Sequence, residues 1–298
     1  MDSLLLLALA PVFLGFIAWE AWYLRRAGRS HYTWADTTSN AALALMHQGA
    51  DALAWLLTFG LFVGLWQHRL FDIPASWWSV ALLVVAQDFF YYWFHRTSHR
   101  VRWLWASHVT HHSSERLNLS TAFRQSLTYP ISGMWLFWLP LAFIGFAPAH
   151  IVTVVALNLA FQFFVHTEAV GRLGWLEAVF NTPSHHRVHH ARNPKYIDRN
   201  YAGIFIIWDK LFGSFTPEDP ADPCEYGITH PVRSHNPITL TFHEWRAMLG
   251  DAVRARGLRA RLVQLFGPPA RALSAQGQPE QAAAQRSPLM SQGLDHHE

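Results

Sequence analysis

The residues with the clearest chemical potential are histidines spaced along one side of a helix. Residues 95–99 read HxxxH, and residues 108–112 and 186–190 each read HxxHH. Helical positions i, i+3 and i+4 share a face, so each motif is predicted to present its imidazoles to one point. Two HxxHH motifs in one chain exceed what chance gives at this histidine content. The predicted metal ligands are His95, His99, His108, His111, His112, His186, His189 and His190, with His166 as a ninth.

The ligand set is rich in nitrogen and lacks thiolate, because Cys224 is the only cysteine. Such a set suits iron, zinc, copper or nickel. Eight or nine imidazoles exceed what one ion binds, so the sequence predicts two ions. A single cysteine excludes an internal disulfide and a four-thiolate zinc or iron–sulfur site. The histidines that stand outside the motifs are interpreted as ordinary structural residues: His31, His47, His68, His150, His230, His235 and His243.

Asp88 lies seven and eleven positions before His95 and His99, which puts all three on one helical face. A carboxylate within an apolar segment is costly and is usually functional or paired. We expect Asp88 to accept a ring N–H from a ligand histidine and so to set its tautomer. The alternative is an ion pair between Asp88 and an arginine at the inner membrane surface.

Other acidic residues lie close to histidines in the sequence. Glu168 follows His166 by two residues and is assigned, with Asp88, to the catalytic site. Glu115, three residues after His112, is a candidate ligand or supporting group. Asp51 and His47 are four residues apart and are predicted to pair, either structurally or beside a substrate cavity. The roles of Asp51, Glu115 and His185 stay open at this stage.

The composition indicates a membrane protein of the all-α class. The chain has 298 residues, of which 51% are hydrophobic and 14% charged; soluble domains have roughly 25% charged residues. Five apolar stretches have close to the ~20 residues that cross ~30 Å of hydrocarbon. We therefore predict a bundle of about five transmembrane helices with a cytosolic helical cap that carries the metal site. The five stretches are 4–24, 41–66, 77–94, 129–147 and 149–166.

The basic residues predict the orientation. Arg25, Arg26 and Arg29 come first, Arg69 stands alone, and the other nineteen lie from Arg96 onward. An outside N-terminus puts 22 of the 23 basic residues in the cytoplasm, as the positive-inside rule requires. The excess of arginine over lysine and the alanine-rich tail indicate a bacterial inner membrane. Because the basic residues flank apolar stretches rather than form a patch, we expect no nucleic-acid partner.

Four regions are expected along the chain. Residues 1–76 form the first transmembrane helices and an outer loop, and 77–220 form the histidine-motif domain. Residues 221–266 form a cytosolic or interfacial segment, and 267–298, rich in Pro, Gln, Ala and Ser, are expected to be disordered. Within the third region, 242–266 has the pattern of a basic amphipathic helix. Such a helix either lies in the membrane interface or packs on the cytosolic cap.

The three histidine motifs on a multi-span scaffold resemble the fatty acid hydroxylase / sterol desaturase superfamily of membrane di-iron oxygenases. The resemblance covers roughly residues 80–216, and the strings at 105–108, 111–115, 118–122, 166–168, 181–190, 200–203 and 207–213 are most similar to its ether-lipid-cleaving members. It implies that the eight motif histidines hold two non-haem iron ions and that His166 matches a further family histidine. It also implies O₂-dependent hydroxylation or desaturation of a lipid chain.

The resemblance implies an external reductant as well, which is tetrahydrobiopterin in the ether-lipid-cleaving members and an electron carrier such as cytochrome b5 in others. The chain has no Gly-rich dinucleotide fingerprint and no haem-attachment motif. We expect a lipid monooxygenase, with a sterol or fatty acyl desaturase as the alternative. The lipid, the attacked carbon and the oligomeric state are left open.

Clustered histidines also occur in proteins of two other functional classes. A membrane metal transporter would place its ligands near the midplane on discontinuous helices, so it is a remote alternative. A zinc metalloprotease needs HExxH, and the nearest candidate, His243-Glu244, has Ala247 in place of the second histidine. The sequence therefore excludes the metalloprotease.

Overall fold

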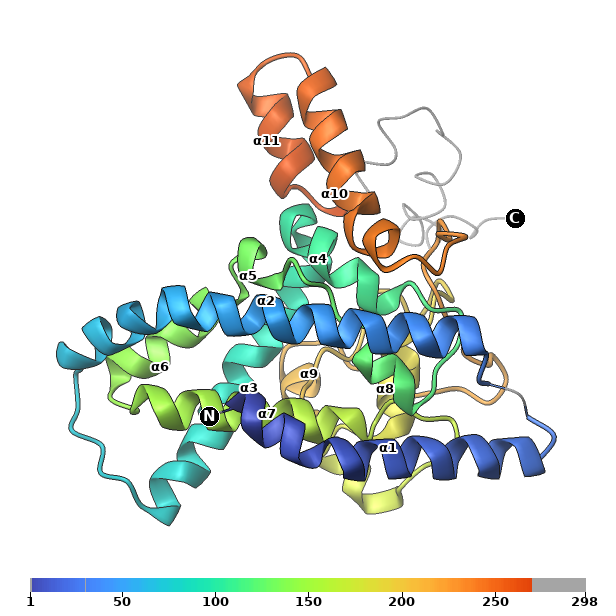
Figure 1. Cartoon of the computed structure of the whole chain (residues 1–298), viewed down its shortest axis with the longest axis horizontal. Helices are drawn as coiled ribbons and strands as arrows, with labels where there is room; N and C mark the ends of the chain where they lie inside the picture. Colours follow the sequence, from blue (N-terminus) through green and yellow to red (C-terminus); the bar gives the residue numbers. More distant parts are fainter. Residues whose placement is uncertain (1, 30, 270–298) are drawn as a thin grey trace, which may run out of the picture.

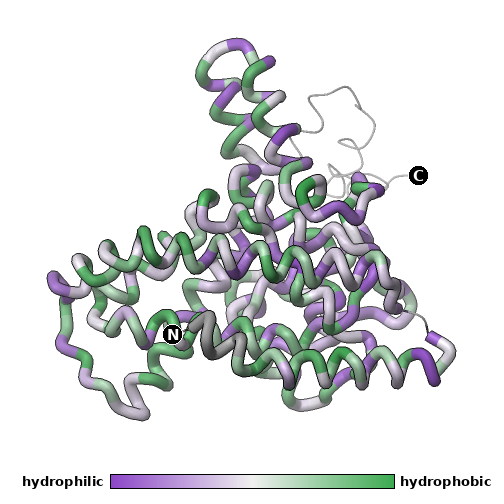
Figure 2. Tube along the Cα trace, viewed as in Figure 1, coloured by the Kyte–Doolittle hydropathy of each residue, from purple (hydrophilic) through white to green (hydrophobic). Residues whose placement is uncertain are grey.

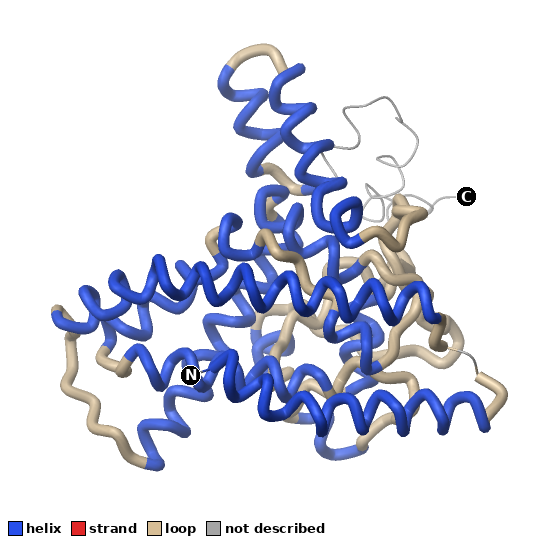
Figure 3. Tube along the Cα trace, viewed as in Figure 1, coloured by secondary structure: helices blue, strands red, loops and turns tan. Residues whose placement is uncertain are grey.

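The computed structural model describes residues 2–29 and 31–269, and every regular element within them is helical (Figures 1 and 3). The all-α class is confirmed. The expected disordered tail lies outside the described residues from position 270 onward. Two isolated β-bridges, Phe180–Phe205 and Ala191–Tyr226, join loop segments. The helices are α1 (Asp2–Arg26), α2 (Trp34–Gln67), α3 (Trp77–Arg100), α4 (Arg102–His112), η1 (Leu119–Phe123), α5 (Tyr129–Ser132), η2 (Met134–Trp138), α6 (Leu139–Ile144), α7 (Pro148–Phe163), η3 (Gly174–Ala178), α8 (Pro183–His190), α9 (Ile207–Leu211), α10 (Pro237–Arg254) and α11 (Leu258–Phe266).

Helix α2 is divided into a polar beginning and an apolar remainder. Asp36, Ser39 and Asn40 are buried in its first turns. From Leu45 onward, large apolar side chains face outward: Leu45, Leu53, Leu56, Leu57, Phe59 and Leu61. Of the helices in the described ranges, α2 alone is both long and apolar enough to cross a membrane. Figure 2 shows apolar positions along both α1 and α2, and exposed apolar surface of this extent is typical of contact with lipid.

The fourth apolar stretch, 129–147, is not the continuous helix that its composition predicts. It consists of α5, η2 and α6. Gly133 has a left-handed backbone (φ 87°) that ends α5, and a proline lies in the first turn of α6. The fifth stretch, α7, has 16 residues, a length of about 24 Å. The described helices thus correspond to the apolar stretches without establishing five membrane spans.

Helices α3 and α4 meet at a single residue, Val101, and together carry five of the motif histidines. A capping box between Ser76 and Ser79 begins α3. Helix α4 packs against α3 on one side and against α10 and α11 on the other. The histidines at the end of α3 and along α4 are therefore held between the apolar bundle and the C-terminal helices.

Arg102 connects these elements at the start of α4. Its side chain is fully buried and lies 2.7 Å from Glu244 and 2.9 Å from Asp251, both on α10. Its guanidinium also donates to Gln264 on α11. A buried guanidinium with two carboxylate partners holds α4, α10 and α11 in one arrangement.

We expect Arg102→Met to destabilise the protein by about 3 kcal/mol, because Glu244 would lose its cation and Asp251 would keep only its pair with the exposed Arg254. The measurement is denaturant unfolding of the purified protein in detergent. The matched control is Arg192→Met, whose exposed pair with Glu225 is 3.5 Å long and is worth less than about 1 kcal/mol. Equal stability of the two variants would contradict the role of Arg102.

Candidate metal centre

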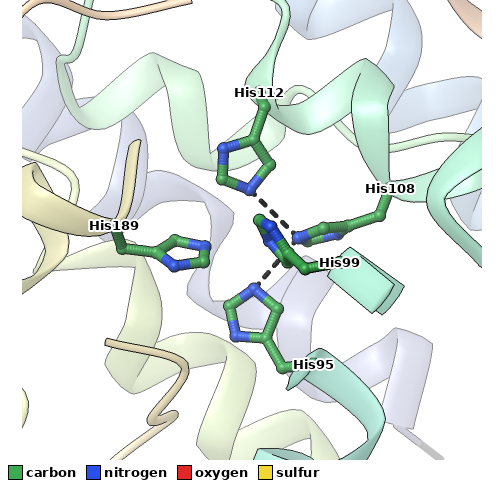
Figure 4. A group of neighbouring side chains, drawn as sticks. All are labelled: His95, His99, His108, His112 and His189. Atoms are coloured by element: carbon green, nitrogen blue, oxygen red, sulfur yellow. Dashed lines mark hydrogen bonds between the residues drawn. The ribbon is translucent and has the colours of Figure 1, made fainter. Parts of the chain in front are cut away.

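The structure brings nine buried histidines together in two groups. Within each group, one possible ligand nitrogen per residue lies within 4.8 Å of all the others. Figure 4 shows the side chains of the first group pointing toward one another. The first group is His95, His99, His108, His112 and His189, and the second group is His111, His166, His186 and His190. All nine are the residues that the sequence predicts as ligands.

Each HxxHH motif supplies histidines to both groups. The expectation that all imidazoles of a motif converge on one point is therefore wrong. Helix α4 gives the i, i+4 pair His108 and His112 to the first group and His111 to the second. Helix α8 does the reverse, giving His186 and His190 to the second group and His189 to the first. The two groups therefore share two helices and lie side by side. Helix α3 supplies His95 and His99 to the first group, and His166 follows α7 in the second.

Backbone carbonyls set the tautomer of four rings. The Nδ1 atoms of His95 and His189 lie 2.7 and 2.9 Å from the carbonyl oxygens of Tyr201 and Arg199. Those of His111 and His166 lie 3.2 and 2.7 Å from the carbonyl oxygens of Arg124 and Gln162. Since a carbonyl only accepts, each Nδ1 carries the hydrogen and each Nε2 carries a lone pair.

Those lone pairs face one another across a short distance. The Nε2 atoms of His111 and His166 are 3.1 Å apart, although neither carries a hydrogen. Two lone pairs at that distance repel, and a cation between them removes the repulsion. The residues present therefore fit metal ions, and the convergence of lone pairs in a buried space is the observation that points to them.

The spacing of the nitrogens suits ligation of one ion by each group. Adjacent Nε2 atoms are 3.0 and 3.1 Å apart in the first group and 2.9, 3.0 and 3.1 Å apart in the second. With a metal–nitrogen bond of about 2.1 Å, two nitrogens on one ion lie about 3.0–3.4 Å apart. The nitrogens of each group are therefore close enough to ligate one ion.

The protonation state of the ligands suits metal binding. Burial, and then the neighbouring histidines, lower the pKa of His112, His186 and His190 well below the ordinary histidine value. These rings therefore stay neutral at physiological pH. Neutral imidazole is the form that ligates a metal, so little proton release opposes binding.

Asp88 supports the site through a loop, and it is not bonded to a histidine ring. Its Oδ1 accepts from the backbone N–H of Ile204 (2.7 Å), and its Oδ2 accepts from that of Phe205 (2.9 Å) and from the indole of Trp208 (3.0 Å). The segment it holds begins at Tyr201, whose carbonyl accepts from His95. Asp88 is thus a positioning residue one step removed from the ligand.

The other acidic candidates lie outside both groups. Glu168 accepts from the hydroxyl of Tyr226 and pairs with His31, 2.5 Å away. Glu115 is exposed.

His185, which precedes the last histidine motif, and His47, in the second apolar stretch, also lie outside both groups. His185 is 4.0 Å from Glu177 and packs against Phe215. The predicted pair of His47 and Asp51 is present, at 3.3 Å.

Sequence reasoning missed Glu20, a fully buried carboxylate of α1. It accepts hydrogen bonds from the hydroxyls of Thr167 and Tyr32 and from the backbone N–H of Leu119. Thr167 directly follows His166, so Glu20 holds the end of the segment that carries a second-group histidine. Asp88 is predicted to be important because it is a carboxylate within an apolar stretch, and Glu20 has the same feature.

Residues 80–214 match the sequence model of the fatty acid hydroxylase family. This range contains all nine histidines of the two groups. The region that builds the candidate metal centre is a fatty acid hydroxylase domain, and the resemblance noted from the motifs is confirmed.

Among proteins of known name, the chain is similar to alkylglycerol monooxygenase. It is 50% identical to the Homo sapiens protein over 187 residues, covering 61% of this chain and 40% of that one. It is 42% identical to the Danio rerio protein over 229 residues, covering 74% of this chain and 50% of that one. An ornithine lipid hydroxylase of Rhizobium tropici is 31% identical over 163 residues, 53% of this chain and 49% of that one. The chain spans half or less of these relatives, and no solved structure matches it.

We expect Gly203→Ala to weaken metal binding in the first group. A Cβ at this position would lie 2.6 Å from Oδ1 of Asp88 and 2.7 Å from Oδ1 of Asn158, so the loop has to move. The carbonyl of Tyr201 then leaves His95, and loss of such an outer partner costs about 10–100-fold in metal affinity. The measurement is iron bound per protein during titration with a competing chelator.

The matched control is Gly171→Ala, because a Cβ at that loop position meets no atom within 4 Å. Unchanged iron affinity in both variants would contradict the role of the loop.

Proposed function

We propose that the chain is a membrane-bound, non-haem di-iron oxygenase that hydroxylates a C–H bond of a lipid chain. The observation that carries the proposal is the pair of buried imidazole groups whose Nε2 lone pairs converge from shared helices. The fatty acid hydroxylase domain and the similarity to alkylglycerol monooxygenase support iron as the metal and a lipid as the substrate.

The nine histidines would hold one iron in each group, and the irons would supply O₂ activation with electrons from outside the chain. The protein's own part is to fix the ligands. Carbonyls hold the rings by Nδ1, and the Tyr129 hydroxyl, 2.7 Å from Nδ1 of His108, orients that ring. Burial of every ligand excludes bulk water, which protects the reaction from side products. The external reductant is tetrahydrobiopterin or an electron-carrier protein.

The substrate would approach along apolar surface. The histidines lie at the ends of α3 and α7 and along α4 and α8, adjacent to helices whose outward side chains are apolar. A lipid chain could thus reach the site without leaving hydrocarbon. If the substrate is an ether lipid, hydroxylation beside the ether oxygen gives a hemiacetal, which collapses to an aldehyde and an alcohol.

We further propose the topology that the charges favour: a bacterial inner membrane, with residues 77–220 carrying the active site on the cytoplasmic side. Residues 1–76 would contribute the first transmembrane helices, and 221–266 an interfacial segment. The distribution of basic residues supports this orientation.

Replacement of one ligand in either group tests the metal assignment. We expect His186→Ala and His189→Ala each to abolish turnover and to reduce bound iron, because His186→Ala removes a ligand of the second group and His189→Ala removes one of the first. The measurements are iron content by mass spectrometry and product formation. His185→Ala is the matched control, since His185 is buried in the same helix but lies outside both groups.

The control is expected to keep its iron. Full turnover of His189→Ala would contradict the site, and exchangeable zinc without oxygen consumption would favour the transporter.

Isotope labelling tests the reaction. Lipids from cells with and without the gene, grown under ¹⁸O₂, are reduced with borohydride and analysed by mass spectrometry. Ether cleavage puts the label into the alcohol derived from the aldehyde, and chain hydroxylation puts it into a hydroxylated lipid. An unlabelled product with a new double bond would indicate the desaturase instead.

A further inference from the structure

Helix α11 has an apolar side that is largely exposed, with one ring contact at its end, between Phe266 and Trp103. None of its residues is fully buried. Gln264 and Leu265 turn toward the body, where Gln264 accepts a hydrogen bond from Arg102 and Leu265 packs against the buried cluster of Ala106, Trp245 and Met248. The other apolar side chains of the helix are 45–73% exposed and lie in one stripe: Leu258, Leu262, Val263 and Phe266.

The charges around this stripe have one sign. Residues 252–267 include four arginines and no acidic residue. Arg259 lies among the stripe residues, helical spacing puts Arg261 beside them, and Arg256 precedes the helix. Arginine side chains can keep their carbons on an apolar surface while the guanidinium reaches a phosphate. The segment therefore fits an apolar layer bordered by negative charge.

The direction of α11 fits the surface of a bilayer. Figure 1 shows α10 and α11 standing across the direction of α2, which runs along the length of the molecule. If α2 crosses the membrane, α11 runs along the membrane plane. An apolar face with a basic border in that orientation is typical of an interfacial helix.

We propose that α11 lies in the headgroup region of an anionic lipid surface, with its apolar stripe against the acyl chains and its arginines at the phosphates. Because Arg102 ties α10 and α11 to α4, this contact also sets the depth of the α4 histidines relative to the bilayer. The inference rests on the membrane embedding within the proposed function, and the experiment separates the two.

The test measures depth with a bimane label on the full chain in nanodiscs that contain phosphatidylglycerol with brominated acyl chains. The label is placed at Leu262→Cys in a Cys224→Ser background. Leu56→Cys on the apolar part of α2 is the membrane reference, and Glu225→Cys, on an exposed loop, is the aqueous reference. Iron content equal to that of the unsubstituted protein verifies the fold of each labelled variant.

We expect bromine quenching at position 262 comparable to that at 56, and none at 225. Quenching at 262 is expected to fall in phosphatidylcholine discs and when Arg256, Arg259 and Arg261 are all replaced by glutamine. In both cases the label at 56 is expected to stay quenched.

Three results would overturn the inference. The first is a quenched label at 56 with an unquenched label at 262. The second is quenching at 262 that is indifferent to lipid charge and to the arginines. The third is an excimer between pyrene labels at 262 in discs holding two copies, which would show that a second chain covers the stripe. An unquenched label at 56 would instead refute the membrane embedding itself.

Discussion

The hydrogen bond from a histidine Nδ1 to a backbone carbonyl is the interaction on which the metal centre depends. It decides which nitrogen carries the proton, and it leaves the Nε2 lone pairs of both groups facing inward. Bringing those lone pairs together is unfavourable until a cation binds, so the fold has to hold the rings in place by other contacts. Much of the buried polar chemistry of this protein serves that purpose.

The supporting polar residues act on the loops that present the carbonyls. Asp88 holds the segment that begins at Tyr201, and Glu20 holds the residue after His166. Arg124 shows the same principle in one residue. Its carbonyl accepts from His111, while its guanidinium is held by Asp36 and Asn40 of α2. Polar side chains at the ends of apolar helices thus have a purpose that differs from catalysis. They fix backbone segments to the rigid helices, and in this way they fix the positions of backbone oxygens that hold the ligand rings.

The motif spacing is sufficient to predict eight of the nine histidines that the structure gathers and the family that they indicate, and the resemblance to that family supports His166 as the ninth. Their division into two groups is not accessible from spacing, because it depends on how α4 and α8 are oriented against each other. The carbonyl partners are also invisible in a sequence, since every residue has a carbonyl and only the tertiary fold selects Arg124 or Tyr201. Some missed features did leave a signal: Gly133 marks the break in the fourth apolar stretch, and Glu20 is as conspicuous as Asp88.

The shared helices bear on the choice between an oxygenase and a metal transporter. A transporter has to strengthen and release its ligation in turn, which requires ligands that move independently. Here α4 and α8 each ligate both groups, so movement of one helix disturbs both ions together. Four of the ligand rings are also fixed by backbone carbonyls outside α4 and α8, and α4 is held in place by the buried pairs of Arg102. Such an arrangement would suit two ions that stay bound while electrons and O₂ arrive and the products leave, because the ligands need not move during the reaction.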